Sequence, residues 1–176
     1  MSTAVIDTCT LINLKNIKRI DLIDYLHYYL ITTVYVVIEI NRGSDSTKKF
    51  FRTLESTNKI QHIKLSIDDL IDMANIPKNK KRLSNPELSC FVKAKNLGCI
   101  TFTDDKKAIK YLSQHLRIEN VKGISDIIGE AYLENYIGDS EVIEFIRVLK
   151  ENRFILPEDY YENLASKKLM KHIAVD

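Results

Sequence analysis

The sequence has few of the residues that build disulfide-linked or zinc-bridged scaffolds. It contains three Cys, an odd number, and no two of them stand at C-x-x-C spacing. A disulfide framework and a structural zinc site are therefore not expected, and a reducing cytosol fits best. The four His are scattered and form no pair at ligand spacing, so a His-rich metal site has no support.

Long apolar runs are also missing from the chain. No stretch approaches the roughly 20 apolar residues that a helix needs to cross a bilayer. The N-terminus, MSTAVIDTCTLINL, lacks the basic region and long apolar segment of a signal peptide. Low-complexity segments, repeats and Gly-, Pro- or Ser-rich linkers are lacking too. We therefore predict a cytoplasmic protein that has no membrane partner.

An excess of either charge is lacking as well, since 26 Lys and Arg face 24 Asp and Glu. This balance argues neither for nor against a nucleic-acid partner, because a small enzyme can gather its acids in one cleft and its bases around it. The length of 176 residues and the 45% hydrophobic content suit one soluble domain. We predict a single domain over residues 1–176, with a helical tail over about 140–176.

Short apolar segments alternate with helical patterns along the chain. Strands are predicted at 3–6, 30–33, 60–65 and 99–103. Helices are predicted at 48–54, 68–74, 85–97, 108–116 and 142–149, with a last helix opening after 157–159. This alternation predicts an α/β fold with a mainly parallel sheet and helices on both faces.

Carboxylates follow two of these predicted strands. Asp7 comes directly after residues 3–6, and Asp104 and Asp105 come directly after the strand at 99–103. In parallel α/β sheets the active cleft lies beyond the carboxyl ends of the strands. Each acid has a structural alternative, because an Asp at this position also caps the following helix.

Glu39 lies in an unusually apolar setting. Residues 34–42 are rich in β-branched side chains, which favour a strand, and only the position before Gly43 indicates a helix end. A carboxylate buried without a partner costs several kcal/mol or takes up a proton. Glu39 therefore reaches solvent, pairs with a cation in a structural ion pair, or binds a metal.

Glu87 stands in the first turn of the helix predicted at 85–97. Ser84 and Glu87 have capping-box spacing, which is the structural interpretation of this acid. Glu87 also shares a helical face with Phe91, so its side chain can lean toward the core. Together the acids suit one or two Mg²⁺ or Mn²⁺ ions, because hard cations take oxygen ligands from several elements. The set consists of Asp7, Glu39, Glu87 and Asp105.

Several segments are similar to those of the PIN-domain nucleases. Residues 4–8 (AVIDT) resemble the family's first strand and its first acid, and Glu39 stands at the spacing of the second acid in compact PIN toxins. Residues 103–108 (TDDKKA) resemble the T-x-D-x-x-F element, in which Asp105 matches the fourth acid and Ala replaces the usual aromatic residue.

The third acid of this family is commonly an Asp at a helix start, where this chain has Glu87. A subgroup of small stand-alone, VapC-toxin-like PIN proteins has Glu there and an Asp-Asp pair after the next strand, as in this chain. Residues 121–124 and 145–161 resemble the last strand and the C-terminal tail of that subgroup. The similarity therefore covers most of the chain.

The resemblance implies a three-layer α/β/α fold and metal-dependent cleavage of RNA to 5′-phosphate and 3′-hydroxyl products. It implies Mg²⁺ or Mn²⁺ held by the four acids, with Asp104 as a further metal ligand beside Asp105. Many small members are toxins that form homodimers and are silenced by an antitoxin protein. Thr8 and Thr103 can hydrogen-bond a ligand carboxylate or a metal-bound water.

Basic residues before the helix at 85–97 are candidates for contacts with RNA phosphates. Such contacts give affinity without sequence choice. The alternative is a solvated loop, and Lys106 and Lys107 have the same two interpretations. The candidates in the loop are Lys78, Lys80, Lys81 and Arg82.

Two other protein classes compete with a nuclease. A haloacid-dehalogenase-like phosphatase also starts with a strand and a nucleophilic Asp, but it needs a second Asp where this chain has Cys9. A catalytically inactive PIN-like module would bind RNA or a protein and would not need the four acids. Substitution of Glu39 and Asp105 separates this module from an enzyme, because the module has no metal-dependent activity to lose.

Overall fold

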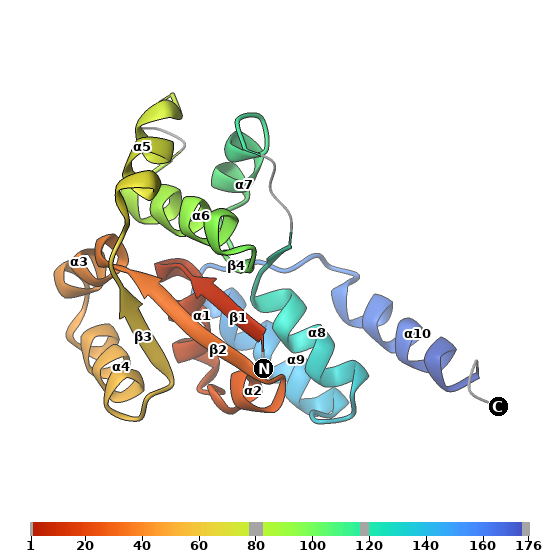
Figure 1. Ribbon diagram of the computed structural model, residues 1–176. Coiled ribbons are helices and arrows are strands. Elements are labelled where there is room, and N and C mark those ends of the chain that lie inside the picture. Colours follow the sequence, from red (N-terminus) through yellow and green to blue (C-terminus); the bar gives the residue numbers. More distant parts are fainter. Residues whose placement is uncertain (1, 78–82, 117–119, 174–176) are drawn as a thin grey trace.

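A computed structural model of the protein describes residues 2–77, 83–116 and 120–173 (Figure 1). Its centre is a five-stranded sheet with the order β3-β2-β1-β4-β5, in which every neighbouring pair is parallel. The strands are β1 Ser2–Ile6, β2 Tyr28–Thr33, β3 Ile60–Ile63, β4 Ile100–Phe102 and β5 Val121–Lys122. The predicted parallel α/β sheet is confirmed.

Helices cover both faces of this sheet (Figure 1). They are α1 Thr8–Ile17, α2 Asp21–Tyr25, α3 Val34–Arg42, α4 Asp45–Ser56, α5 Ile67–Asn75, α6 Asn85–Leu97, α7 Lys106–Leu112, α8 Ile124–Leu133, α9 Asp139–Glu151 and α10 Tyr160–Ile173. Helices α1, α8 and α9 pack together on one face, and α6 covers the other with α5 and α7 against it. The result is the three-layer α/β/α arrangement.

The buried apolar side chains form two clusters. The larger joins the sheet to its flanking helices and includes Leu30, Phe102 and Ile127, all fully buried. The smaller joins α5, α6 and α7 through side chains such as Phe91 and Leu112. Because α7 follows β4 after only a short turn, this second cluster holds α6 and α7 beside the carboxyl ends of the central strands.

Residues Val34–Arg42 form a helix, although their β-branched side chains favour a strand. Val36 and Ile40, one turn apart, are buried, whereas Ile38 lies 41% exposed on the other side. Packing of this one apolar stripe outweighs the local strand propensity. The helix ends at Gly43, whose amide donates to the Ile40 carbonyl.

One helix ends earlier than predicted, and the last helix begins at Tyr160, directly after residues 157–159 as predicted. Helix α7 ends at Leu112, and turns follow where the apolar pattern continued to Leu116. Helix α10 leaves the body of the molecule toward the C-terminus (Figure 1). Its Leu164 packs on α8 at Gly129, where an added Cβ would lie 3.2 Å from a Leu164 methyl group. Among the helices of the described residues, none has the length and apolar character needed to cross a membrane.

Candidate active site at the carboxyl edge of the sheet

Asp7 lies at the carboxyl end of β1, next to the end of β4. Its amide donates to the Phe102 carbonyl at 3.0 Å, and its side chain is only 2% exposed. One carboxylate oxygen, Oδ1, accepts the Thr10 amide at 3.0 Å and so caps α1. The other, Oδ2, accepts the Thr103 hydroxyl from the β4 side. Asp7 is therefore both a helix cap and the buried end of a cleft.

Cys9 bridges Asp7 and the end of β4. Its Sγ lies 3.0 Å from each Asp7 carboxylate oxygen and accepts the Asp104 amide at 3.1 Å. Burial and then the nearby Asp7 charge raise the pKa of the Cys9 thiol well above its usual range, so the thiol keeps its proton and donates it. Sequence reasoning missed this role, because the Cys9 partner at Asp104 is distant along the chain.

The Asp7 carboxylate is held without a compensating cation. Burial raises the pKa of Asp7 to about 6, although hydrogen bonds from Cys9, Thr103 and Thr10 lower it. Among the described residues, no Lys or Arg forms an ion pair with Asp7. A buried carboxylate of this kind attracts a positive ion.

Glu87 and Asp105 face each other across the starts of two helices. The predicted capping box is present, because the Ser84 amide donates to Glu87 Oε2 at 2.6 Å and the Glu87 amide donates to Ser84 Oγ at 3.4 Å. Asp105 caps α7, and its Oδ1 accepts the Lys107 and Ala108 amides at 2.7 and 2.8 Å. Burial, together with nearby Asp105, raises the pKa of Glu87 to about 7.

Glu39 is exposed, so its carboxylate is not buried among its apolar neighbours in the sequence. It projects from the exposed side of α3, and its Oε2 accepts the Thr8 hydroxyl at the start of α1. The helix therefore turns Glu39 away from the apolar stripe of Val36 and Ile40 and toward the end of β1.

Three of the four acids share one cleft with a volume of about 210 Å³. Asp105 adjoins the cleft through its contact with Glu87. Within the described part of the chain, no three His, Cys, Asp or Glu side chains converge closely enough to hold a metal ion as they stand. Glu87 and Asp105 instead direct oxygens at helix N-termini. The cleft is lined by Asp7, Thr8, Cys9, Ile12, Glu39, Ser84, Pro86 and Glu87.

A family model described as a PIN domain matches residues 3–169. The chain belongs to the PIN-domain family. The similarity of its motifs to that family is thereby confirmed, over nearly the whole chain.

A solved structure shows the same fold at low sequence identity. One chain in the crystal structure of VapBC2 from Rickettsia felis, bound to a DNA fragment from their promoter, superposes with a TM-score of 0.50 and 11% identity. The match covers 69% of this PIN domain and 98% of that chain. No curated protein matches the chain.

Asp104 of this PIN domain points away from the cleft, and both its oxygens are engaged. Oδ2 accepts the Asn13 side-chain amide of α1 at 2.8 Å, and Oδ1 accepts the Ile124 amide of α8 at 2.8 Å. A Cβ on Gly123 would lie 2.3 Å from Asp104 Oδ1, so only glycine allows this approach. Asp104 thus joins α1, β4 and α8, while Asp105 faces Glu87.

The predicted phosphate contacts before α6 fall outside the described residues of this PIN domain. They are Lys78, Lys80, Lys81 and Arg82. Lys106 and Lys107 are described, and both are exposed in the first turn of α7, directly after Asp105.

Proposed function

We propose that this PIN domain is a Mg²⁺- or Mn²⁺-dependent endoribonuclease whose active site is the 210 Å³ cleft at the ends of β1 and β4. The observation that carries the proposal is the gathering of acids from separate elements around the buried Asp7 without a compensating cation among the described residues. Burial raises the pKa of both Asp7 and Glu87, which is typical of groups with a task in a cleft.

The donor set fits a hard divalent cation. We assign the ligands as Asp7, Glu39, Glu87 and Asp105, all oxygen donors. We place Asp104 outside the set because its carboxylate turns to Asn13 and Ile124 and does not line the cleft. When bound, such a cation acidifies a water molecule and neutralises charge on the phosphodiester.

The residues around the acids orient them. The Thr103 hydroxyl and the Cys9 thiol hold the Asp7 carboxylate, and the Thr8 hydroxyl holds Glu39. Glu87, with a pKa of about 7, keeps a proton in part of the molecules at neutral pH. It gives up that proton when positive charge enters the cleft.

We extend the proposal to a toxin role in a toxin–antitoxin pair, as a homodimer with an antitoxin segment covering the cleft. This extension is supported by the fold shared with a chain of the VapBC2 complex. One observation favours a second candidate, a PIN module that binds RNA or a protein without cleaving it. In the described residues, no three potential ligand side chains converge as they stand.

Cleavage of an unstructured RNA pool in Mn²⁺, Mg²⁺ or EDTA tests the proposal. Asp7→Asn removes the central ligand, and Asp45→Asn is the matched control, because Asp45 is exposed on α4 and pairs only with Lys48 among described residues. Metal-dependent cleavage by the wild type and the control, lost in Asp7→Asn, supports the nuclease. RNA binding without cleavage and without a Mn²⁺-induced rise in Tm selects the binding module.

A further inference from the structure

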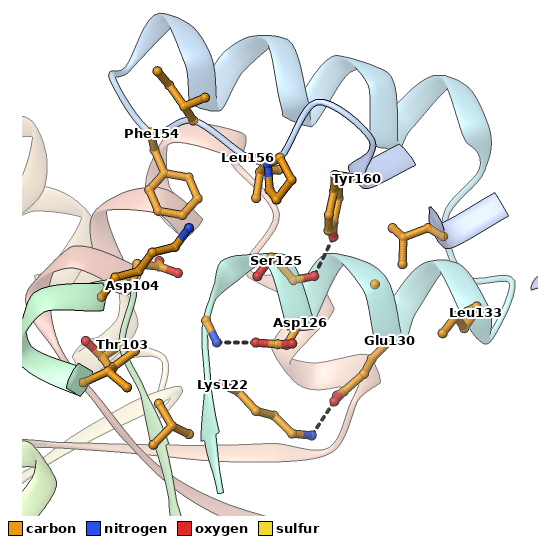
Figure 2. Close-up of a pocket in the computed structure, with 18 of the residues that line it drawn as sticks. Thr103, Asp104, Lys122, Ser125, Asp126, Glu130, Leu133, Phe154, Leu156 and Tyr160 are labelled. Carbon is orange, nitrogen blue, oxygen red and sulfur yellow. Dashed lines mark hydrogen bonds and ion pairs between the residues drawn. The ribbon is translucent and has the colours of Figure 1, made fainter. Parts of the chain in front are cut away.

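A second cavity, of about 420 Å³, has Thr103 and Asp104 in its lining (Figure 2). Three segments form its walls: residues 103–109, residues 121–133 with α8, and residues 154–167. The last of these includes the non-helical segment 154–157 between α9 and α10, which we call the strap. Thr103 belongs to both sites, since its hydroxyl donates to Asp7 while the residue lines this cavity. Thr103, which is 2% exposed, thus stands between this cavity and the Asp7 carboxylate.

The strap lines this cavity with apolar side chains that remain partly or largely exposed to solvent. Phe154 is half-buried, Ile155 is 70% exposed and Pro157 is exposed, and all three line the cavity. Figure 2 shows Phe154 on the side toward Asp104, with Leu156 and Tyr160 following along α8. Clustered apolar exposure of this kind marks a binding surface.

The cavity is preformed, because both ends of the strap are fastened. The Phe154 amide donates to the Leu149 carbonyl of α9 at 2.9 Å. The Tyr160 hydroxyl donates to the Ser125 carbonyl of α8 at 2.5 Å, as the dashed line in Figure 2 shows. A ligand entering this cavity does not have to order its walls, which reduces the entropy lost on binding.

The acids and lysines around the cavity balance in number, but two of the lysines are exposed and can contact an anionic group. The acids in its walls have partners: Glu130 pairs with Lys122, Asp104 accepts the Ile124 amide and Asp126 accepts the Gly123 amide. Two further wall residues, Lys106 and Lys167, are exposed. Neither forms an ion pair with any residue that the structure describes.

We propose that this cavity binds one nucleotide of the RNA next to the scissile phosphate, an inference that rests on the proposed nuclease function. The base packs against Phe154 and the strap, and the phosphate lies near Lys106 and Lys167. Aromatic rings and apolar walls accept any base by stacking, and lysines contact phosphates. The combination of an apolar wall, lysines and a wall shared with Asp7 favours RNA over a protein segment.

Titration of the full-length ¹⁵N-labelled protein with each of the four 5′-mononucleotides in EDTA tests the cavity without any cleavage. Amide shifts are expected at 123–126 and 154–160. Phe154→Ala should weaken binding by roughly tenfold or more, given the usual contribution of a stacked base. Lys167→Ala should weaken it as well. Ile155→Ala shortens an exposed side chain that also lines the cavity. It therefore tests the same wall if Phe154→Ala fails to fold.

Matched controls lie on α9, outside the cavity. Ile143→Ala removes an isoleucine that is 53% exposed, and Lys150→Ala removes an exposed lysine, so both should bind nucleotides like the wild type. Shifts confined to other regions, or equal affinity in the cavity variants, overturn the proposal. Absence of binding by all four nucleotides also overturns it and leaves a protein segment as the occupant.

Cleavage assays then separate the two proposals. If the wild type cleaves RNA, Phe154→Ala should raise KM and alter the base preference beside the cut, while the Mn²⁺-induced rise in Tm stays unchanged. If the wild type cleaves no RNA, the nuclease proposal fails, and the mononucleotide titration still decides whether the cavity is a nucleotide site.

Discussion

The Sγ of Cys9 lies 3.0 Å from each carboxylate oxygen of Asp7. The thiol is a donor here, because burial and the Asp7 charge keep its pKa well above the usual range. This contact gives the end of β1 a neutral hydrogen-bond donor in place of a cation. The position beside Asp7 thus stays available for a positively charged ion.

Cys9 should therefore resist alkylation in the folded protein. Only the thiolate reacts, and each unit by which the pKa rises lowers the thiolate fraction about tenfold. We expect iodoacetamide at pH 8 to modify Cys9 more than about tenfold more slowly in the folded protein than in urea. Peptide mass spectrometry with a glutathione rate control measures this, and equal rates in both states would contradict the assigned donor.

Asp7→Asn should stabilise the metal-free protein at pH 8. The folded pKa of Asp7, about 6, exceeds the usual value of 3.8, so the folded state binds more protons than the unfolded state between these values. The Asp7 contribution to stability therefore falls as pH rises through this window. Urea unfolding in EDTA should show a gain of about 1–3 kcal/mol for the variant. The gain should vanish at pH 4, and a loss of stability at pH 8 would refute the cost assigned to this carboxylate.

Asp69 should have the opposite pH dependence. It is 1% exposed; burial by itself raises its pKa, but hydrogen bonds from Lys93, the Ser66 amide and Asn96 outweigh burial and lower the pKa to about 2. Its stabilising contribution is present above the usual pKa of 3.8 and is lost as pH falls toward 2.

Asp69→Asn should consequently cost about 2 kcal/mol at pH 7 and little at pH 2. The matched control is Asp68→Asn, since Asp68 is the exposed neighbour in the same turn of α5. Urea midpoints across this pH range measure both variants. Equal effects of the two substitutions at pH 7 would show that the contacts of Asp69 with Lys93 and Asn96 of α6 do not stabilise the fold.

Gly123→Ala should disturb the contact between Asp104, which follows β4, and the start of α8. The added Cβ would lie 2.3 Å from Asp104 Oδ1, so Asp104 or the start of α8 must shift, at a cost of about 1–3 kcal/mol. Gly138→Ala is the control, because Gly138 also stands at a helix N-cap and has no atom within 4 Å of the new Cβ. Thermal unfolding compares them, and a harmless Gly123→Ala would mean that Asp104 moves freely.

Local signals made some elements predictable from the sequence. Helix α6 was predicted at 85–97 because Ser84, Glu87 and Gly98 mark both of its ends within the segment itself. Residues 34–42 were ambiguous because strand propensity and the helix-end signal of Gly43 disagree. Packing against α6 and the sheet, which the local sequence does not contain, selects the helix.

Part of the candidate site was predictable from the topology of a parallel sheet. The rule that strands of a parallel sheet end at one edge brought Asp7 and the Asp104–Asp105 pair together. It does not say which member of the pair faces Glu87, because that depends on Asn13 and Ile124, distant along the chain. The second cavity gave no signal either, since three separate segments form its walls.

The packing of α10 on α8 at Gly129 connects the C-terminal helix to the second cavity. Leu164 packs at Gly129, and the Tyr160 hydroxyl fastens the strap to α8. A binding partner that pulled α10 from α8 would release the strap and remove one wall of the second cavity without touching any acid of the cleft. In the proposed nuclease, nucleotide binding would then depend on the position of α10, while cleavage would depend on the acids at the ends of β1 and β4.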